Sequence, residues 1–203
     1  MTTSQGVTGN YDSVMAKEPK AVFDYLEWYY VKPFAKRWKH KIRKTKRVDD
    51  KQYEFDTFIA NYLIYAALVN VIKPCDFRTR EDKAYCTDIM ANFILENTTH
   101  SSLLILNLTA PAAILGEVIK NYHFCVVSSK SDNPELETNW KQGSNKNKLL
   151  SLLQTLYYMR CNIFHGAKEY VDEQVALLSP ANKCLEIINK EIQQIYAKYD
   201  INQ

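Results

Sequence analysis

The stretch SPANKCLEIINKEIQQIYAKY, residues 179–199, decides the fold class of this chain. Its apolar side chains recur at alternating spacings of four and three residues, which is the pattern of a helix face that packs against another helix. Serine followed by proline is typical of a helix start, so we expect this helix to begin at residues 179–180. Its expected packing positions are Ala181, Leu185, Ile188, Ile192, Ile195 and Tyr199.

Two earlier segments also show helical spacing. A helix is expected over residues 51–72, ended by Pro74, and another over 80–96, which opens with the charged residues Arg-Glu-Asp-Lys. A third helix is expected from about residue 146 to His165, with three leucines on one face. The expected apolar stripe of the first helix is Phe55, Phe58, Ile59, Tyr62, Ala66 and Val69, and that of the third is Leu149, Leu153 and Leu156.

The remaining segments are less regular. Pro111 suits the first position of a helix that runs to about Tyr122. The preceding SSLLILNL segment fits either a helix or a buried extended chain. Residues 128–147 are polar and turn-rich, and they are expected to form a long loop.

Composition agrees with a helical protein. The chain has 203 residues with only 5 glycines and 6 prolines, and it is long enough for one good core. We therefore predict an all-α bundle of five to seven helices that forms one domain over residues 19–203. The polar residues 1–18 are expected to form a loose tail.

The cysteines and the hydropathy pattern bear on the cellular setting. The five cysteines are odd in number and widely spaced, and no C-x-x-C pair occurs, which argues against a disulfide framework and a zinc site. The N-terminus has no apolar signal core, and the apolar runs look too short to span a bilayer. We expect a cytoplasmic protein without membrane association, metal site or cofactor.

Positive charge is concentrated in one segment, although the net charge is only +3. Residues 36–47 read KRWKHKIRKTKR, with eight lysines or arginines and no acid. Such a run is either a solvated charged face or a surface that follows an RNA backbone, where Trp38 and His40 would offer stacking surfaces. The candidate RNA-binding cations are Lys36, Arg37, Lys39, Lys41, Arg43, Lys44, Lys46 and Arg47.

The segment RCNIFHG, residues 160–166, has two interpretations. A glycine after a helix is a common C-cap, and arginine and histidine in the last turn complement the helix dipole, so the segment can be an ordinary helix end. It can also be a reactive site. Arg160 and His165 would point about 140° apart on a regular helix, whereas Asn162 and His165 would lie close together. Either unwinding at Gly166 or a second chain at a two-fold axis would complete such a site.

This segment resembles the HEPN family of helical nucleases. RCNIFHG is similar to that family's arginine, asparagine, apolar, F-H-G pattern, and the aromatic helix FDTFIANYLIYAALVNVI, residues 55–72, is similar to its second element. The resemblance extends over residues 20–200, and its specific part is about seven residues long. It implies a helical fold and metal-independent RNA cleavage.

The resemblance assigns roles that suit the residue types. His165 would take a proton from the ribose 2′-OH or give one to the leaving 5′ oxygen. Arg160 would hold the scissile phosphate, and Asn162 would orient the histidine or the phosphate. Attack by the 2′-OH leaves a 2′,3′-cyclic phosphate and a 5′-hydroxyl.

The family also suggests a homodimer in a toxin–antitoxin pair or in antiviral defence, with an antitoxin or regulatory protein as a possible partner. Some members are silenced by modification of a tyrosine two residues after the histidine, but that position is Ala167 here, which puts this mode of control in doubt. The alternative to a nuclease is a non-catalytic module that binds RNA or nucleotides or serves assembly. A third reading is a structural bundle in which RCNIFHG is only a helix end.

Overall fold

A computed structural model describes residues 50–72, 82–121, 136–164 and 173–201. Almost every residue in these ranges is helical and none forms a strand, which confirms the expected all-α bundle. The predicted tail over residues 1–18 and the basic segment over 36–47 lie outside the described residues. The elements are α4 (Asp50–Ile72), α5 (Asp82–Ala84), the π-helical turn η2 (Tyr85–Ile89), α6 (Met90–Asn97), α7 (Ser101–Asn121), α8 (Leu136–Gln142), α9 (Asn145–Phe164) and α10 (Glu173–Ile201).

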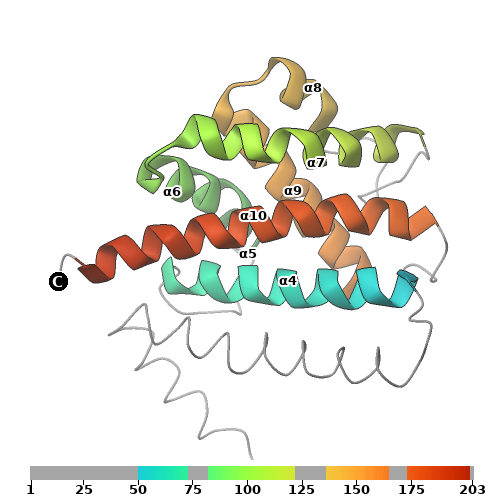
Figure 1. The fold of residues 1–203 in the computed structure, drawn as a ribbon, viewed down its shortest axis with the longest axis horizontal. Coiled ribbons are helices and arrows are strands. Elements are labelled where there is room, and N and C mark those ends of the chain that lie inside the picture. The colour runs from blue at the N-terminus through green and yellow to red at the C-terminus, as the bar shows by residue number, and fades with distance from the viewer. Residues whose placement is uncertain (1–49, 73–81, 122–135, 165–172, 202–203) are drawn as a thin grey trace, which may run out of the picture.

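Helix α10 lies between α4 and α7 and packs against both (Figure 1). It runs parallel to α4 and antiparallel to α7. Its apolar face is buried as the 4-3-4-3 spacing predicts, since five of the six expected positions are at most 1% exposed. These five are Ala181, Leu185, Ile188, Ile192 and Ile195; the side chain of Tyr199 lies outside the described part.

A second line of contacts between α4 and α10 is polar, and the sequence pattern did not predict it. Three buried side chains of α10, spaced seven residues apart, donate hydrogen bonds to three backbone carbonyls of α4 that are also spaced seven residues apart. Because both spacings are equal, the two helices keep one parallel register over their shared length. The pairs are Asn182 to Glu54 at 2.9 Å, Asn189 to Asn61 at 3.0 Å and Tyr196 to Leu68 at 3.0 Å.

Two prolines do not begin helices as predicted. Pro111 lies inside α7, which starts ten residues earlier at Ser101, and Pro180 lies inside α10, which starts at Glu173. A proline in a helix interior costs about 3 kcal/mol because it removes one hydrogen bond and crowds the preceding turn. Both prolines are buried, and the apolar burial on either side of them offsets that cost. The ambiguous SSLLILNL segment is therefore the first part of α7.

The predicted loop over residues 128–147 is wrong where the structure describes it. Helix α8 lies within this range and buries Leu136 and Trp140 against the core. Helix α9 then begins at Asn145, where the hydroxyl of Ser144 accepts a hydrogen bond from the backbone N–H of Asn147 at 3.3 Å, as an N-cap does. The polar composition of this segment did not indicate a helix. A helix as short as α8 needs only two large apolar residues to pack against the core.

From Asp82 onward, where the structure describes it, the expected helix over residues 80–96 is a continuous run through α5, η2 and α6. Its middle is a π-helical turn. The buried hydroxyl of Tyr65 on α4 donates to the carbonyl of Cys86 in this turn at 2.7 Å. A π turn widens the helix and rearranges its backbone hydrogen bonds. The contact from Tyr65 therefore fixes the α5–η2 segment against α4.

The expectation that the apolar runs are too short to span a bilayer is wrong by length and composition, since two described helical stretches, Tyr53–Ile72 and Ser101–Asn121, are long and apolar enough. The bundle buries 33% of the first and 39% of the second. Helices of this length and composition also occur as core helices of soluble proteins. In this fold both stretches contribute to the core around α10.

We predict that Tyr196→Phe lowers the free energy of unfolding by about 1 kcal/mol, because it removes only the buried hydroxyl that bonds to Leu68. Tyr53→Phe is the matched control, since Tyr53 is 42% exposed and water can replace its hydroxyl contacts. Urea denaturation of both variants measures the difference. Equal stability of the two variants would show that the polar line does not stabilise the α4–α10 contact.

Candidate functional site

The motif residues Arg160 and Asn162 lie in the last turns of α9, where this helix leaves the core. The preceding turns are buried through Leu152, Leu156 and Met159, whereas both motif residues are half-buried. Residues two apart on a regular helix point about 160° away from each other. One chain therefore does not bring these two side chains to a common point within α9. His165 and Gly166 lie outside the described residues.

The guanidinium of Arg160 packs between α9 and α4. Its Cζ atom lies 6.0 Å from the centroid of the Tyr62 ring, within the range of a cation–π contact. Its Nη1 donates to Sγ of Cys161 at 3.8 Å. Burial lowers the pKa of Arg160, but the hydrogen bond to Cys161 and the charge interactions with Tyr62, Cys161 and Asp82 outweigh it and leave the pKa raised. Arg160 is therefore a fixed cation at a half-buried position.

The wall that faces Arg160 is aromatic and uncharged. Tyr62 stacks near Phe58 at 6.1 Å and meets Tyr65 edge-on at 5.6 Å between ring centroids. Burial, and then the neighbouring thiol of Cys86, raises the pKa of Tyr62 well above its usual range. Tyr62 thus stays a neutral phenol at physiological pH. This wall shields one side of the guanidinium from water.

Two tyrosines directly before the motif on α9 form a cluster with a lysine of α5, and the sequence pattern did not assign these residues to the site. Lys83 of α5 donates to the hydroxyl of Tyr158 at 2.5 Å, and the Tyr157 and Tyr158 rings lie 5.9 Å apart, edge to face. Burial, and then Cys161 and Asp82, raises the pKa of Tyr157 to about 12. The one signal in the sequence is the Tyr-Tyr pair directly before RCNIFHG. The contact between Lys83 and Tyr158 joins residues that are 75 positions apart, so no local sequence pattern indicates it.

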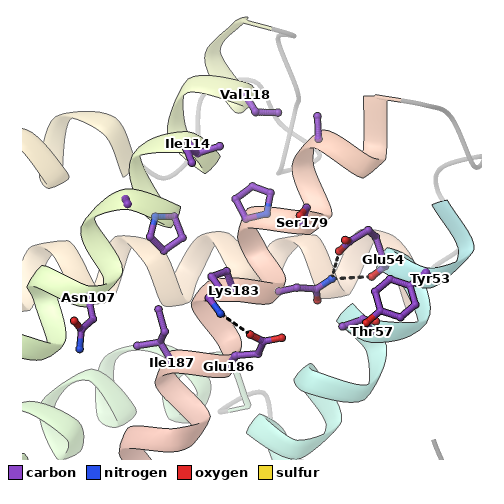
Figure 2. Close-up of a pocket in the computed structure, with 15 residues that line it drawn as sticks. Tyr53, Glu54, Thr57, Asn107, Ile114, Val118, Ser179, Lys183, Glu186 and Ile187 are labelled. Atoms are coloured by element: carbon purple, nitrogen blue, oxygen red, sulfur yellow. Dashed lines mark hydrogen bonds and ion pairs between the residues drawn. The ribbon is translucent and has the colours of Figure 1, made fainter. Parts of the chain in front are cut away.

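A separate groove of about 880 Å³ lies over α10, between α4 and α7 (Figure 2). Glu54 accepts a hydrogen bond from Asn182 at 2.7 Å at one side, and Lys183 and Glu186 form an ion pair at 3.2 Å on the α10 surface. The interior prolines Pro111 and Pro180 line it as well. None of the residues predicted for the RNA site is among the described residues that line this groove.

Other predicted features of the site are only partly visible. In the described ranges, no three His, Cys, Asp or Glu side chains gather as metal ligands. All eight basic residues predicted to bind RNA, from Lys36 to Arg47, lie outside the described residues. The described site therefore consists of Arg160, Asn162 and their aromatic and basic neighbours.

Comparison of the chain with protein-family models, with curated proteins and with solved structures found no match. The similarity to HEPN proteins therefore depends on the RCNIFHG residues themselves and on the helices that carry them.

We predict that iodoacetamide labels Cys161 before Cys86 and Cys184 in the folded protein at pH 8. Cys161 is half-buried, whereas the other two are buried, and burial raises the pKa of Cys184 to about 12, so that its thiol stays protonated. Mass spectrometry of the labelled peptides gives the order. Labelling of Cys184 at the rate of Cys161 would contradict the burial described for α9 and α10.

Proposed function

We propose that this chain is a metal-independent endoribonuclease of the HEPN type that acts as a homodimer. The observation that carries the proposal is the position of Arg160, a fixed cation where α9 leaves the core, within the segment RCNIFHG. A half-buried guanidinium with one face against an aromatic wall suits a phosphate better than a solvated surface arginine does.

The proposed chemistry uses three side chains and the RNA itself. His165, with a reference pKa of about 6.5, removes the proton of the ribose 2′-OH, or protonates the leaving 5′ oxygen. The 2′ oxygen forms a bond to phosphorus while the bond from phosphorus to the 5′ oxygen breaks. Arg160 stabilises the charge on the phosphate oxygens, and Asn162 orients the histidine or the phosphate. The products carry a 2′,3′-cyclic phosphate and a 5′-hydroxyl.

The divergence of Arg160 and Asn162 on α9 supports the homodimer in this proposal. Side chains that point about 160° apart cannot both contact one phosphate from a regular helix. A two-fold axis beside the end of α9 would place two sets of Arg160, Asn162 and His165 in one cleft. Each phosphate could then be held by groups from both chains.

The remaining parts of the proposal rest on the resemblance and the sequence. The basic segment 36–47 would bind the RNA backbone on either side of the cleaved bond. A cytoplasmic role in antiviral defence or in a toxin–antitoxin pair, with an antitoxin or other regulatory protein as partner, is what the family suggests. Ala167 replaces the tyrosine that would be modified, so any such partner would act in another way.

We predict that His165→Ala abolishes cleavage of single-stranded RNA and that Arg160→Ala lowers kcat about 100- to 1000-fold, the usual effect of losing one group that stabilises transition-state charge. Asn162→Ala should lower kcat less, because the asparagine orients the histidine or the phosphate and carries no charge. Cleavage rates in EDTA, with circular dichroism to verify folding, test this. Lys183→Ala on α10, whose lysine is exposed and paired with Glu186, is the matched charge-loss control and should cleave like the wild type.

An assembly module is the second candidate, and the outer face of α7 favours it. Leu103, Leu106 and Ile114 are 51%, 67% and 52% exposed, and the helix carries no charged residue from Ser101 to Gly116. Exposed apolar residues gathered on one helix face often mark a protein contact. Leu106 and Ile114 lie four residues on either side of the exposed Ala110, so the face is suited to pair with a second copy in the antiparallel direction.

We predict that Leu106→Glu weakens self-association through α7 at least tenfold, because a carboxylate buried without a partner costs several kcal/mol. Light scattering over a concentration series measures the mass, and Gln193→Glu on the exposed face of α10 is the matched control. A dimer that Leu106→Glu leaves intact would show that α7 is not the interface.

A further inference from the structure

Two tyrosines lie one turn before the motif on α9, one on the side of each motif residue. Tyr157 precedes Arg160 by three residues, and Tyr158 precedes Asn162 by four. Side chains three or four residues apart are neighbours on a helix surface. Each motif residue therefore has a tyrosine one turn away on its own side of α9, and the contact between the two rings at 5.9 Å joins these two sides.

Lys83 is held at the edge of this tyrosine pair by the neighbouring helix. Its carbonyl accepts a hydrogen bond from the hydroxyl of Thr87 at 2.7 Å, within the helical run that Tyr65 fixes against α4. Its ammonium donates to the Tyr158 hydroxyl and lies 4.8 Å from the centre of that ring. Lys83 is exposed, so a flexible cation is pinned beside an aromatic ring and remains open to solvent.

We infer that Lys83, Tyr157 and Tyr158 form a binding surface for one unpaired nucleotide at the end of α9 that carries Arg160. The inference rests on the proposed function and adds residues to it. The Lys83 ammonium contacts a phosphate, and the base packs on the Tyr158 ring. Aromatic rings beside cations bind single-stranded nucleic acid because every unpaired base offers a face for stacking.

The charges around this surface agree with an anionic ligand. The two cations, Lys83 and Arg160, come from α5 and α9. Asp82 is the described acid whose charge acts on Arg160 and on Tyr157. Lys83 is the cation that contacts the tyrosine pair directly, and the positive charge of Arg160 also acts on Tyr157. A base held in a duplex cannot stack on a tyrosine ring, so the surface selects single-stranded RNA over double-stranded RNA.

Binding is measured separately from cleavage by using His165→Ala protein and a fluorescently labelled 12-nucleotide single-stranded RNA. Fluorescence anisotropy over a salt series gives Kd and its salt dependence. Adding Lys83→Ala should weaken binding about three- to tenfold and lower the slope of log K against log salt by about 0.7, as loss of one phosphate contact does. Tyr158→Ala should weaken binding at least about fivefold. Lys190→Ala, an exposed lysine on α10, is the control and should change neither quantity.

Tyr158→Phe guards against a folding effect, because it keeps the ring and removes only the hydroxyl bonded to Lys83. It should bind RNA more tightly than Tyr158→Ala and less tightly than the parent protein. The same changes in active protein should raise KM and leave kcat within about twofold. Equal binding by Lys83→Ala and Lys190→Ala would overturn the inference, and so would tighter binding of a duplex than of the single strand.

The outcomes separate this inference from the proposed function. Cleavage that depends on His165 but is unaffected by Lys83→Ala and Tyr158→Ala would overturn the nucleotide surface and leave the nuclease standing. RNA binding that depends on Lys83 and Tyr158, in a wild-type protein that never cleaves RNA, would overturn the nuclease and support the surface. No RNA binding by the folded His165→Ala protein would overturn the surface.

Discussion

The parallel contact between α4 and α10 is the constraint on which the rest of this structure depends. Parallel helices that are distant in sequence need something that sets their register, and here side chains seven residues apart on α10 reach carbonyls seven residues apart on α4. With that register set, Tyr62 and Tyr65 of α4 take fixed positions. Tyr65 holds the π turn near Lys83, and Tyr62 packs on Arg160. Contacts made by core residues of α4 therefore set the positions of Arg160 and of the segment that carries Lys83.

The sequence was sufficient to predict the apolar part of this arrangement. The 4-3-4-3 spacing after Ala181 identified a buried face because hydrophobic periodicity reflects burial directly. The polar line could not be predicted, because Asn182 and Asn189 look like solvated residues until a partner helix is known. The helix starts predicted at the two prolines were wrong for a related reason. Proline is typical of the first turn of a helix, and only tertiary packing shows that α7 and α10 continue through Pro111 and Pro180.

The residues of the candidate site also fall into two groups, those that a local sequence motif indicates and those that only tertiary packing brings together. Arg160 and Asn162 were proposed from a short motif, since their spacing and residue types carry a signal in the sequence. Lys83 was not found, because its contact with Tyr158 exists only after α5 and α9 have packed together. The two-residue spacing of Arg160 and Asn162 already implied that their side chains point in opposite directions if the segment is a helix. The structure shows that both residues lie within the helix Asn145–Phe164. This divergence is the structural observation that supports the proposed homodimer.

Mapping the ends of RNA fragments made in the presence of EDTA tests the central claim most directly, because the position of the phosphate after cleavage records which oxygen attacked. We expect fragments with a 2′,3′-cyclic phosphate and a 5′-hydroxyl, since in the proposed reaction the neighbouring 2′ oxygen is the nucleophile and His165 only moves protons. Fragments with a 3′-hydroxyl and a 5′-phosphate would show that water or a metal-bound hydroxide attacked. That result would contradict the role assigned to the RCNIFHG segment.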